Sequence, residues 1–256
     1  MRHLLGVLGC CWACSVPHDA KRSEPRASVS AVPSVASSAP RSDPGPIRME
    51  QLEPRAPGEP PVFVMRGGPR GPGHLVFLHG MCGHGLGYAQ AFQFAAAKIG
   101  TLIAPQGDVS CGDVWSKWSG DLAALDARIA AAFRALGDTR ELDDVWVLGM
   151  SQGATRAVAL VRKYPRRYTH LVSMDAPTAL KSGDWKQLRA AVMMAGERDR
   201  QDLMRQSERA LRASGVPTQY LVIPEATHGA MGPTPEKTME TALQFLQQHA
   251  ADSPRP

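Results

Sequence analysis

Short apolar runs alternate with longer amphipathic segments through most of the chain, and this alternation is what most constrains the fold. The apolar runs are rich in Val, Ile, Leu and Met, which is typical of strands in a parallel sheet covered on both faces. Strands that alternate with helices predict a three-layer α/β/α sandwich with a mostly parallel sheet and right-handed crossovers. The expected strands are residues 62–65, 75–78, 101–104, 145–148, 170–174, 191–194 and 220–223, and the expected helices are residues 88–99, 122–136, 154–164, 202–214 and 236–249.

The alternation covers residues 61–250, which suffices for one domain without a large cap and leaves residues 251–256 as a tail. No apolar run approaches the roughly 20 residues that a membrane-spanning helix needs. The formal charge of +5 is mildly basic. Several basic residues lie on or just after the expected helix at 154–164, without interleaved aromatic residues. They indicate a solvated helix face, and we expect no nucleic-acid partner.

The first residues differ in composition from the rest of the chain. A short basic start and the apolar run at residues 4–9 precede Cys10, with two more cysteines by residue 14. This arrangement resembles a bacterial lipoprotein signal in which Cys10 is the lipidated residue, although the apolar run is shorter than usual. Residues 1–14 are therefore predicted to direct export. The alternative is an ordinary disordered tail on a cytoplasmic protein.

Residues 15–60 are rich in Ser, Ala, Pro and Arg and show no sustained helical or strand period. Such a segment does not bury enough apolar surface to offset its chain entropy. We expect a disordered tether. Behind a lipidated Cys10 it would hold the domain off a membrane surface.

The pentapeptide Gly149-Met150-Ser151-Gln152-Gly153 stands between an expected strand and an expected helix. A serine on such a sharp turn has a strained backbone that pushes its hydroxyl out of the sheet, and the flanking glycines let the turn close. The N–H of the following residue, Gln152, then faces a developing oxyanion. The alternative is that Ser151 is only a helix N-cap.

A nucleophilic serine needs a base, and the base needs an acid that orients it. Downstream of Ser151, Asp199 follows the expected strand at 191–194 and His228 follows the one at 220–223. Carboxyl ends of parallel strands gather at one edge of the sheet, so we expect the three side chains to meet there. Asp175 and Asp202 remain alternatives for the acid.

Two other histidines compete with His228 for the role of base. His79 ends the expected strand at 75–78 and is more consistent with a structural role, whereas His84 is a candidate for lining a substrate pocket. No His or Cys cluster has the spacing of metal ligands, so we expect no metal.

From about residue 62 to residue 249 the chain resembles small α/β-hydrolases of the carboxylesterase, phospholipase and dienelactone-hydrolase kind. The resemblance rests on the motif around Ser151, the Gly-Glu-Arg-Asp turn at Asp199, the Thr-His-Gly loop at His228 and a His-Gly pair at a strand end. It implies that Ser151 is the nucleophile, His228 the general base and Asp199 its orienting acid. It further implies an oxyanion hole formed by the backbone N–H groups of Met81 and Gln152.

The function that this resemblance implies is cleavage of a small-molecule or lipid-like carboxylic ester through an acyl-enzyme, without a cofactor. The same triad also serves thioesterases, peptidases and polyester depolymerases, and fold analogy does not separate these activities. A hypothesis from another class is a surface-tethered binding protein on a scaffold that no longer catalyses. The sequence gives no indication of the oligomeric state.

Two cysteines and two tryptophans of the expected domain lie in loops at the same edge. Cys82 lies in the expected oxyanion loop and Cys111 in the loop after the next strand, so an oxidising compartment predicts a disulfide between them. The alternative is two free thiols that pack as small apolar residues. Trp115 and Trp118 follow the same strand and, with His84, are candidates for the wall of an apolar or aryl substrate pocket. The alternative is that both tryptophans pack their loop onto the domain.

Overall fold

The computed structural model describes residues 47–54, 57–67, 73–138 and 142–250 of the 256-residue chain. The predicted signal segment at residues 1–14, the lipidation candidate Cys10, most of the predicted tether and the tail at 251–256 lie outside the described residues. Among the helices of the described ranges, none combines the length and the apolar character that crossing a membrane requires.

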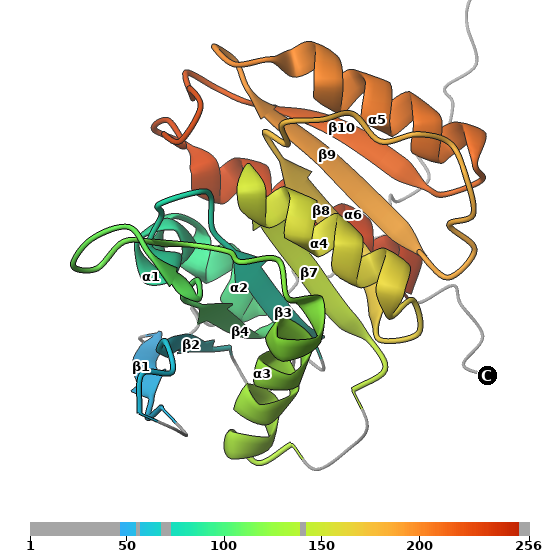
Figure 1. Cartoon of the computed structure of the whole chain (residues 1–256). Coiled ribbons are helices and arrows are strands. Elements are labelled where there is room, and N and C mark those ends of the chain that lie inside the picture. Colours follow the sequence, from blue (N-terminus) through green and yellow to red (C-terminus); the bar gives the residue numbers. More distant parts are fainter. Residues whose placement is uncertain (1–46, 55–56, 68–72, 139–141, 251–256) are drawn as a thin grey trace, which may run out of the picture. The chain divides into compact units, whose positions relative to one another are not determined.

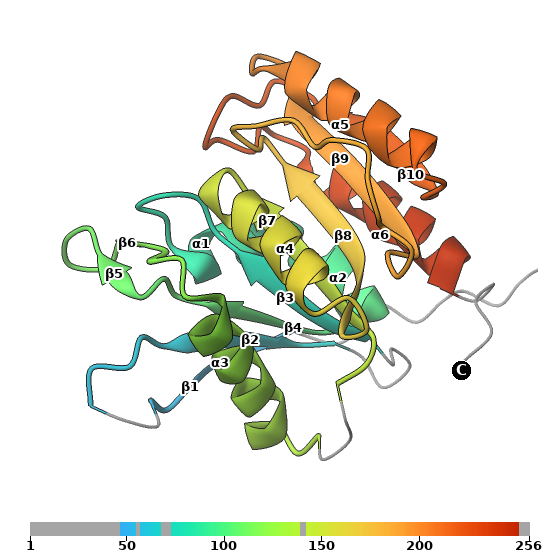
Figure 2. The same cartoon turned by 45° about the vertical axis from the view of Figure 1, so that its right-hand side comes forward.

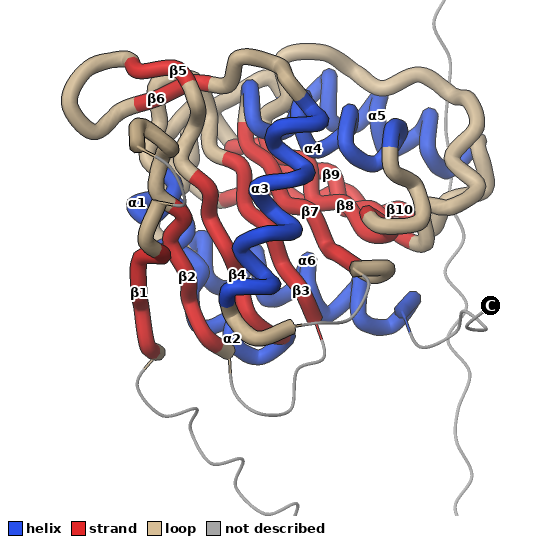
Figure 3. Tube along the Cα trace, turned by 60° about the horizontal axis from the view of Figure 1, so that its bottom comes forward, coloured by secondary structure: helices blue, strands red, loops and turns tan. Residues whose placement is uncertain are grey.

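An eight-stranded sheet forms the middle of the domain, in the order β1-β2-β4-β3-β7-β8-β9-β10 (Figure 3). The six strands from β4 to β10 in this order run parallel to one another, while β1 and β2 pair antiparallel at one edge. The predicted mostly parallel sheet is therefore confirmed. The strands are β1 (Arg48–Leu52), β2 (Val62–Arg66), β3 (Gly73–Leu78), β4 (Gly100–Pro105), β7 (Val145–Met150), β8 (Tyr168–Met174), β9 (Ala190–Gly196) and β10 (Thr218–Ile223).

Helices cover both faces of the sheet (Figures 1 and 2). One layer contains α3, α4 and α5, and the other contains α1, α2 and α6. A separate two-stranded ribbon, β5 with β6, lies in the loop after β4. The helices are α1 (Gly85–Ala89), α2 (Gln93–Ile99), α3 (Leu122–Ala135), α4 (Gln152–Lys163), α5 (Gln201–Ala213) and α6 (Pro235–Ala250), and the ribbon strands are β5 (Val109–Ser110) and β6 (Ser116–Lys117).

The strand β3 illustrates why its apolar run is continuous. Val76 and Leu78 point into the core under α3, α4 and α5, whereas Leu75 and Phe77 point into the core on the opposite face, and all four side chains are fully buried. Side chains alternate between the two faces of a strand. A sheet covered on both sides therefore needs apolar residues at every position.

An additional edge strand in the domain's N-terminal part corrects the sequence prediction. Arg48–Leu52 forms the edge strand β1, although the predicted disordered tether extended to residue 60. This strand is largely polar and gains its order from pairing with β2, where Glu50 also forms an ion pair with Arg66 at 2.7 Å. Pairing with a partner far along the chain is not visible in local composition.

The helix expected at residues 88–99 is interrupted. It begins earlier, as α1, continues through the 3₁₀ turn Gln90–Phe92 and resumes as α2. Phe92 leaves the helical conformation, with φ of −140° and ψ of 30°, and its fully buried ring lies 5.3 Å from that of Phe77. Core packing of this one ring accompanies the break.

No helix forms between β8 and β9 in the described chain, and the connecting segment at 175–189 crosses over α4 and α5 instead. The Leu180 N–H donates to Ser207 Oγ of α5 at 2.9 Å, and Trp185 is buried with the guanidinium of Arg162 4.4 Å from its ring centroid. These contacts hold the segment against the two helices.

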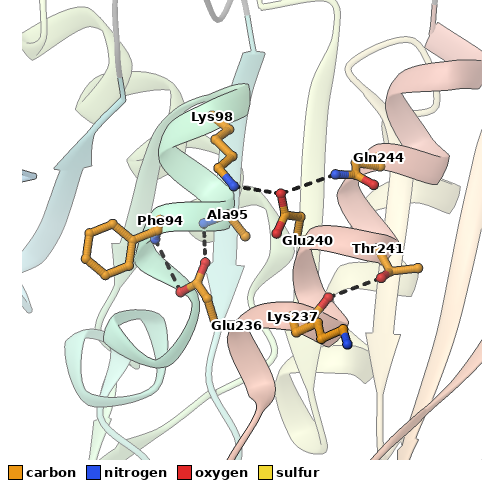
Figure 4. Close-up of polar contacts among 8 residues, drawn as sticks. All are labelled: Phe94, Ala95, Lys98, Glu236, Lys237, Glu240, Thr241 and Gln244. Atoms are coloured by element: carbon orange, nitrogen blue, oxygen red, sulfur yellow. Dashed lines mark hydrogen bonds and ion pairs between the residues drawn. The ribbon is translucent and has the colours of Figure 1, made fainter. Parts of the chain in front are cut away.

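Figure 4 shows how α6 docks on α2. The Glu236 carboxylate, in the first turn of α6, accepts the N–H groups of Phe94 and Ala95 at the start of α2, and Lys98 pairs with Glu240 at 2.6 Å. The first N–H groups of a helix lack partners within it, so Glu236 acts as a cap supplied by another helix. These bonds attach α6, which follows the His228 loop, to α2, which follows the expected oxyanion loop.

Candidate active site

The carboxyl ends of four adjacent parallel strands bring the polar residues of the site together. Ser151 follows β7, Asp175 follows β8, Asp199 lies in the turn after β9 and His228 lies in the loop after β10. The Ser151 N–H donates to the Met174 carbonyl at 2.9 Å, so the serine turn is bound to the end of the neighbouring strand. The parallel register thus places side chains from four distant segments at one edge.

Ser151 occupies a strained turn between β7 and α4. Its φ of 51° and ψ of −116° lie outside the regions that a non-glycine residue usually adopts. The two glycines of the motif are required by close approach: a Cβ on Gly149 would lie 2.4 Å from the Gly153 carbonyl oxygen, and a Cβ on Gly153 would lie 2.0 Å from that of Leu78. The Ser151 side chain makes no capping bond to α4. The N-cap alternative is therefore not what the structure shows.

Ser151, His228 and Asp199 form a hydrogen-bonded series. Ser151 Oγ lies 3.0 Å from His228 Nε2, and His228 Nδ1 lies 2.7 Å from Asp199 Oδ2. The carboxylate accepts the proton on Nδ1, so Nε2 is left as the acceptor for the serine hydroxyl. The His228 side chain is 54% exposed, which leaves the site open to solvent.

The Asp199 carboxyl is held in its ionised form. Its partial burial raises its pKa, but hydrogen bonds from the Arg200 N–H, from His228 and from Asp175 outweigh this effect and leave the pKa below its ordinary value. The alternative acid Asp202 is 68% exposed and pairs with Arg200 at 3.3 Å. Of the acids considered from the sequence, Asp199 is the one that bonds to His228.

His79 has a structural position. Its buried imidazole donates from Nδ1 to the Gly80 carbonyl at 2.7 Å and accepts the Gly107 N–H at Nε2 at 2.9 Å. Burial, together with the charges of His84 and Arg128, lowers the His79 pKa to about 4 against the opposing bond to Gly80. A neutral imidazole with both nitrogens bonded ties the loop after β3 to the loop after β4.

The loop at residues 79–85 passes directly beside the serine. A Cβ on Gly80 would lie 3.4 Å from the Ser151 Cβ, so the loop backbone contacts the turn. Within the described residues the N–H of Met81 donates to no backbone carbonyl. The N–H of Gln152 is the first of α4 and has no partner inside its helix. Two backbone donors of the predicted oxyanion hole are thus available at this edge.

The Gln152 side chain fixes the adjacent loop. Its Oε1 accepts the Trp118 N–H at 3.1 Å, and its Nε2 donates to the Trp118 carbonyl at 3.2 Å. The Trp118 indole is 4% exposed, donates to the His79 carbonyl at 2.8 Å and lies against the His79 ring. This is the packing role that was the alternative to a pocket wall for Trp118.

Cys82 and Cys111 are joined by a disulfide, with Cα atoms 5.5 Å apart, so the predicted bond is confirmed. Backbone bonds support it: the Gly83 N–H donates to the Ser116 carbonyl at 3.0 Å, and the Ser116 N–H donates to the Gly83 carbonyl at 3.2 Å. Cys82 adopts a φ of 48°, next to Met81. The disulfide and the backbone bonds attach the loop at 79–85 to the β5–β6 ribbon.

His84 and Trp115 lie in edge-to-face contact at the same end of the sheet, with ring centroids 6.2 Å apart. Trp115 is 50% exposed and Met81 is 63% exposed, so large apolar side chains reach solvent from the ribbon and from the expected oxyanion loop. His84 Nδ1 accepts the Gly87 N–H at the start of α1, and partial burial lowers the His84 pKa. The assignment of His84 and Trp115 to a substrate pocket remains a prediction.

A cavity of about 320 Å³ lies apart from the serine, between α3 and the segment after β6. Its lining includes Trp118, Asp121 and Arg156 but not Ser151. In the described ranges, no group of three or more His, Cys, Asp or Glu side chains is arranged to hold a metal ion.

Sequence reasoning missed two residues near the site. The Tyr88 hydroxyl donates to the Gly229 carbonyl, directly after His228, at 2.9 Å. Asp175 is buried and accepts the Gly196 N–H, at the end of the strand that leads to Asp199, at 2.9 Å, whereas the sequence offered it only as a competing acid. A tyrosine in an amphipathic segment does not indicate a hydrogen bond to a loop far along the chain. For Asp175, its position at the end of a strand indicated only that it lies at the same edge of the sheet as the site.

The comparisons with known proteins show similarity in structure alone, since no protein-family model and no curated protein matches the sequence. The structure resembles the substrate-bound fluorophosphonate-binding serine hydrolase F of Staphylococcus aureus, with a TM-score of 0.60 and 14% identity over 79% of this chain and 99% of that one. It also resembles the S-formylglutathione hydrolase of the same organism (TM-score 0.58, 14% identity, 78% and 98% covered). A bacterial membrane phospholipase A is similar as well (TM-score 0.56, 14% identity, 80% and 87% covered). By its sheet order, its two helical layers and these similarities, the chain has the α/β-hydrolase fold.

Proposed function

We propose that this protein is a serine hydrolase that cleaves carboxylic esters through an acyl-enzyme intermediate. The observation that carries the proposal is the hydrogen-bonded series from Ser151 Oγ to His228 Nε2 and from His228 Nδ1 to Asp199. A serine in a strained turn, a base within hydrogen-bonding reach and an ionised acid behind the base are the parts that acyl transfer requires. Structurally similar proteins, among them an arylesterase and a ferulic acid esterase, support the same proposal.

In the proposed reaction, Ser151 Oγ attacks the ester carbonyl carbon while His228 Nε2 takes the hydroxyl proton. The N–H groups of Met81 and Gln152 donate to the negative oxygen of the tetrahedral intermediate. His228 then gives its proton to the leaving alcohol, and the acyl group stays on Ser151. Water then attacks the acyl carbon while His228 Nε2 takes its proton; the bond from the acyl carbon to Ser151 Oγ breaks, His228 returns that proton to Oγ, and the acid leaves. Asp199 stays ionised and holds the imidazole, because His228 Nδ1 donates to it.

The test uses the Ser151→Ala variant and short p-nitrophenyl esters. We expect turnover to fall to the background rate, while circular dichroism and the melting temperature show that the variant is folded. The native protein should also react with a fluorophosphonate in one-to-one ratio, and S151A should not. Unchanged esterase activity in S151A would end the assignment. Failure of the native protein to react with the fluorophosphonate would favour the alternative hypothesis of a non-catalytic binding protein.

We also propose that the protein works outside the cytoplasm, anchored through Cys10. The Cys82–Cys111 disulfide supports an oxidising compartment, where such bonds persist. Metabolic labelling with a fatty-acid alkyne should mark the native protein and not the Cys10→Ser variant. Recovery of the unlabelled native protein in the cytoplasmic fraction would contradict this proposal without touching the chemistry of Ser151.

A further inference from the structure

Two segments of the site, the acid turn at residues 196–200 and the base loop at residues 224–229, follow adjacent strands. Gly196 on β9 and Ile223 on β10 are the last partners in the parallel register of these strands. The Glu197 N–H continues the ladder, since it donates to the Ile223 carbonyl at 2.9 Å. The acid turn and the base loop therefore begin side by side.

Two further hydrogen bonds join these segments beyond the sheet. The Arg198 N–H donates to the Ala226 carbonyl at 2.9 Å. The Glu225 N–H donates to Oε2 of the Glu197 carboxylate at 2.8 Å. In this second bond the acceptor is a side chain, whereas the ladder of the sheet uses backbone carbonyls. Glu197 therefore connects the acid turn to the base loop through its side chain.

Glu225 has a backbone conformation that needs such a contact. Its φ of 56° is left-handed, which residues other than glycine seldom adopt, and such strain persists only where the surrounding contacts determine it. The Glu225 carboxylate is 61% exposed and lies 3.9 Å from the Arg198 guanidinium, which is 63% exposed. An exposed pair of this kind contributes little. The link to Glu197 therefore depends on the backbone N–H of Glu225 and not on its side chain.

The base loop needs anchors because His228 is poorly enclosed. The His228 side chain is 54% exposed, so packing around the ring does little to orient it. On one side of His228 the Tyr88 hydroxyl bonds to the Gly229 carbonyl. On the other side the loop is bonded to Glu197. These two contacts hold the loop before and after the imidazole.

We propose that Glu197 is a positioning residue, whose carboxylate fixes the base loop against the acid turn and so keeps His228 Nδ1 within bonding distance of Asp199. Asp199 lies two residues after Glu197, and His228 lies three residues after Glu225. The bond between Glu197 and Glu225 thus closes a ring of contacts that contains the 2.7 Å bond from His228 to Asp199. The effect on catalysis rests on the proposed function, whereas the orientation of the imidazole does not.

Two substitutions of Glu197 separate the hydrogen bond from the charge. In Glu197→Gln the amide oxygen still accepts the Glu225 N–H, whereas Glu197→Ala removes the acceptor. We expect kcat of E197A for p-nitrophenyl esters to fall by about tenfold with little change in KM, because a displaced base slows proton transfer without altering substrate binding. The bond between Arg198 and Ala226 limits the displacement. E197Q should recover most of the loss.

Glu225→Gln is the matched control, because it removes an exposed carboxylate from the base loop and keeps the backbone N–H. It should retain the native kcat. All rates are divided by the number of sites that a fluorophosphonate titrates, so that unfolded protein is not counted. Equal losses in E197Q and E197A would show that the charge matters and not the bond, and would overturn the proposal. A native kcat in E197A, or a loss in E225Q as large as that in E197A, would overturn it as well.

The tautomer of His228 tests the positioning without any substrate. While Nδ1 donates to Asp199, the neutral ring carries its proton on Nδ1, and the nitrogen chemical shifts of an isotope-labelled protein show which ring nitrogen is protonated. The native protein, E197Q and E225Q should show the Nδ1-protonated form, and E197A should show a mixture with the Nε2-protonated form. The Nδ1-protonated form alone in E197A would contradict the proposal. If the native protein hydrolyses no ester but E197A shows the mixture, the proposed function fails and the positioning role of Glu197 stands.

Discussion

The Tyr88 hydroxyl donates a hydrogen bond to the Gly229 carbonyl at 2.9 Å, across 141 residues of sequence. Tyr88 lies in α1, directly after the loop that supplies the expected oxyanion donor, and Gly229 follows His228. Gly229 has a φ of 87°, so the histidine loop turns sharply at the point where the tyrosine holds it. The bond therefore ties the position of the base to the position of the oxyanion loop.

From this contact we predict that Tyr88→Phe lowers kcat for p-nitrophenyl esters by about fivefold, which corresponds to the loss of about 1 kcal/mol. The ring and its contact with Phe77 stay in place, so the variant should fold normally. Tyr220→Phe is the matched control, since it also removes one bonded hydroxyl, at 3.1 Å from Gln201. Equal effects of the two substitutions would show that Tyr88 has no special relation to His228.

The second prediction concerns the glycine that lets α4 begin against β3. In Gly153→Ala the new methyl group would lie 2.0 Å from the Leu78 carbonyl oxygen, so the helix start must move. We expect a loss of about 2–3 kcal/mol in the free energy of unfolding and the loss of fluorophosphonate labelling at Ser151. Urea denaturation and labelling of the folded fraction measure the two effects.

Gly87→Ala serves as the control for this experiment, because its Cβ would meet no atom closer than 4.0 Å. A helical Gly→Ala change without a clash should leave the protein equally stable or more stable by up to about 1 kcal/mol. Similar behaviour of the Gly153 and Gly87 variants would refute the argument from close approach.

The third prediction concerns the disulfide. The double variant Cys82→Ser with Cys111→Ser should lose about 2–4 kcal/mol in the free energy of unfolding. Without the disulfide the unfolded chain gains conformational entropy, which favours the unfolded state. We also expect kcat to fall, since Met81 precedes Cys82 in the loop that faces Ser151. Dithiothreitol should reproduce both effects in the native protein and change nothing in the double variant. Full activity of the reduced native protein would show that the backbone bonds between Gly83 and Ser116 suffice.

The fourth prediction is a dependence of stability on pH that originates in His79. Its pKa is about 4 in the folded protein and about 6.5 when unfolded, so between these values only the unfolded chain binds the proton. The neutral His79 therefore contributes to the free energy of unfolding. This contribution is fully present above pH 6.5, is lost as the pH falls towards 4, and amounts to about 3 kcal/mol over this window.

Asp175 has the opposite effect, because its raised pKa lowers the stability as the pH rises towards 6. Comparison with His79→Gln removes this effect, since both proteins contain Asp175. The native protein should exceed H79Q in stability at pH 7, and the difference should narrow by about 3 kcal/mol on going to pH 4. Urea denaturation at several pH values gives both curves. A constant difference would mean that the imidazole does not stay neutral in the fold.

Local pattern was sufficient to predict the strands of the parallel sheet and most helices, because a strand buried on both faces needs apolar residues at every position. The strand β1 could not be predicted in this way. Its residues are mainly polar, and pairing with β2 gives them order. The break at Phe92 escaped prediction for a similar reason, since it accompanies the packing of one ring in the core.

The sequence by itself determined which residues are available for chemistry: a serine between two glycines, and acids and histidines at the ends of strands. Only the tertiary structure decided which of them meet. It placed His228 between Ser151 and Asp199, kept His79 in a neutral structural position and set Asp175 behind Asp199 as a buried neighbour. The reason is that strand order and register set which strand ends lie side by side, and burial there shifts the pKa values of the side chains that meet. Neither the strand order nor the burial of a side chain can be read from the residues around one position.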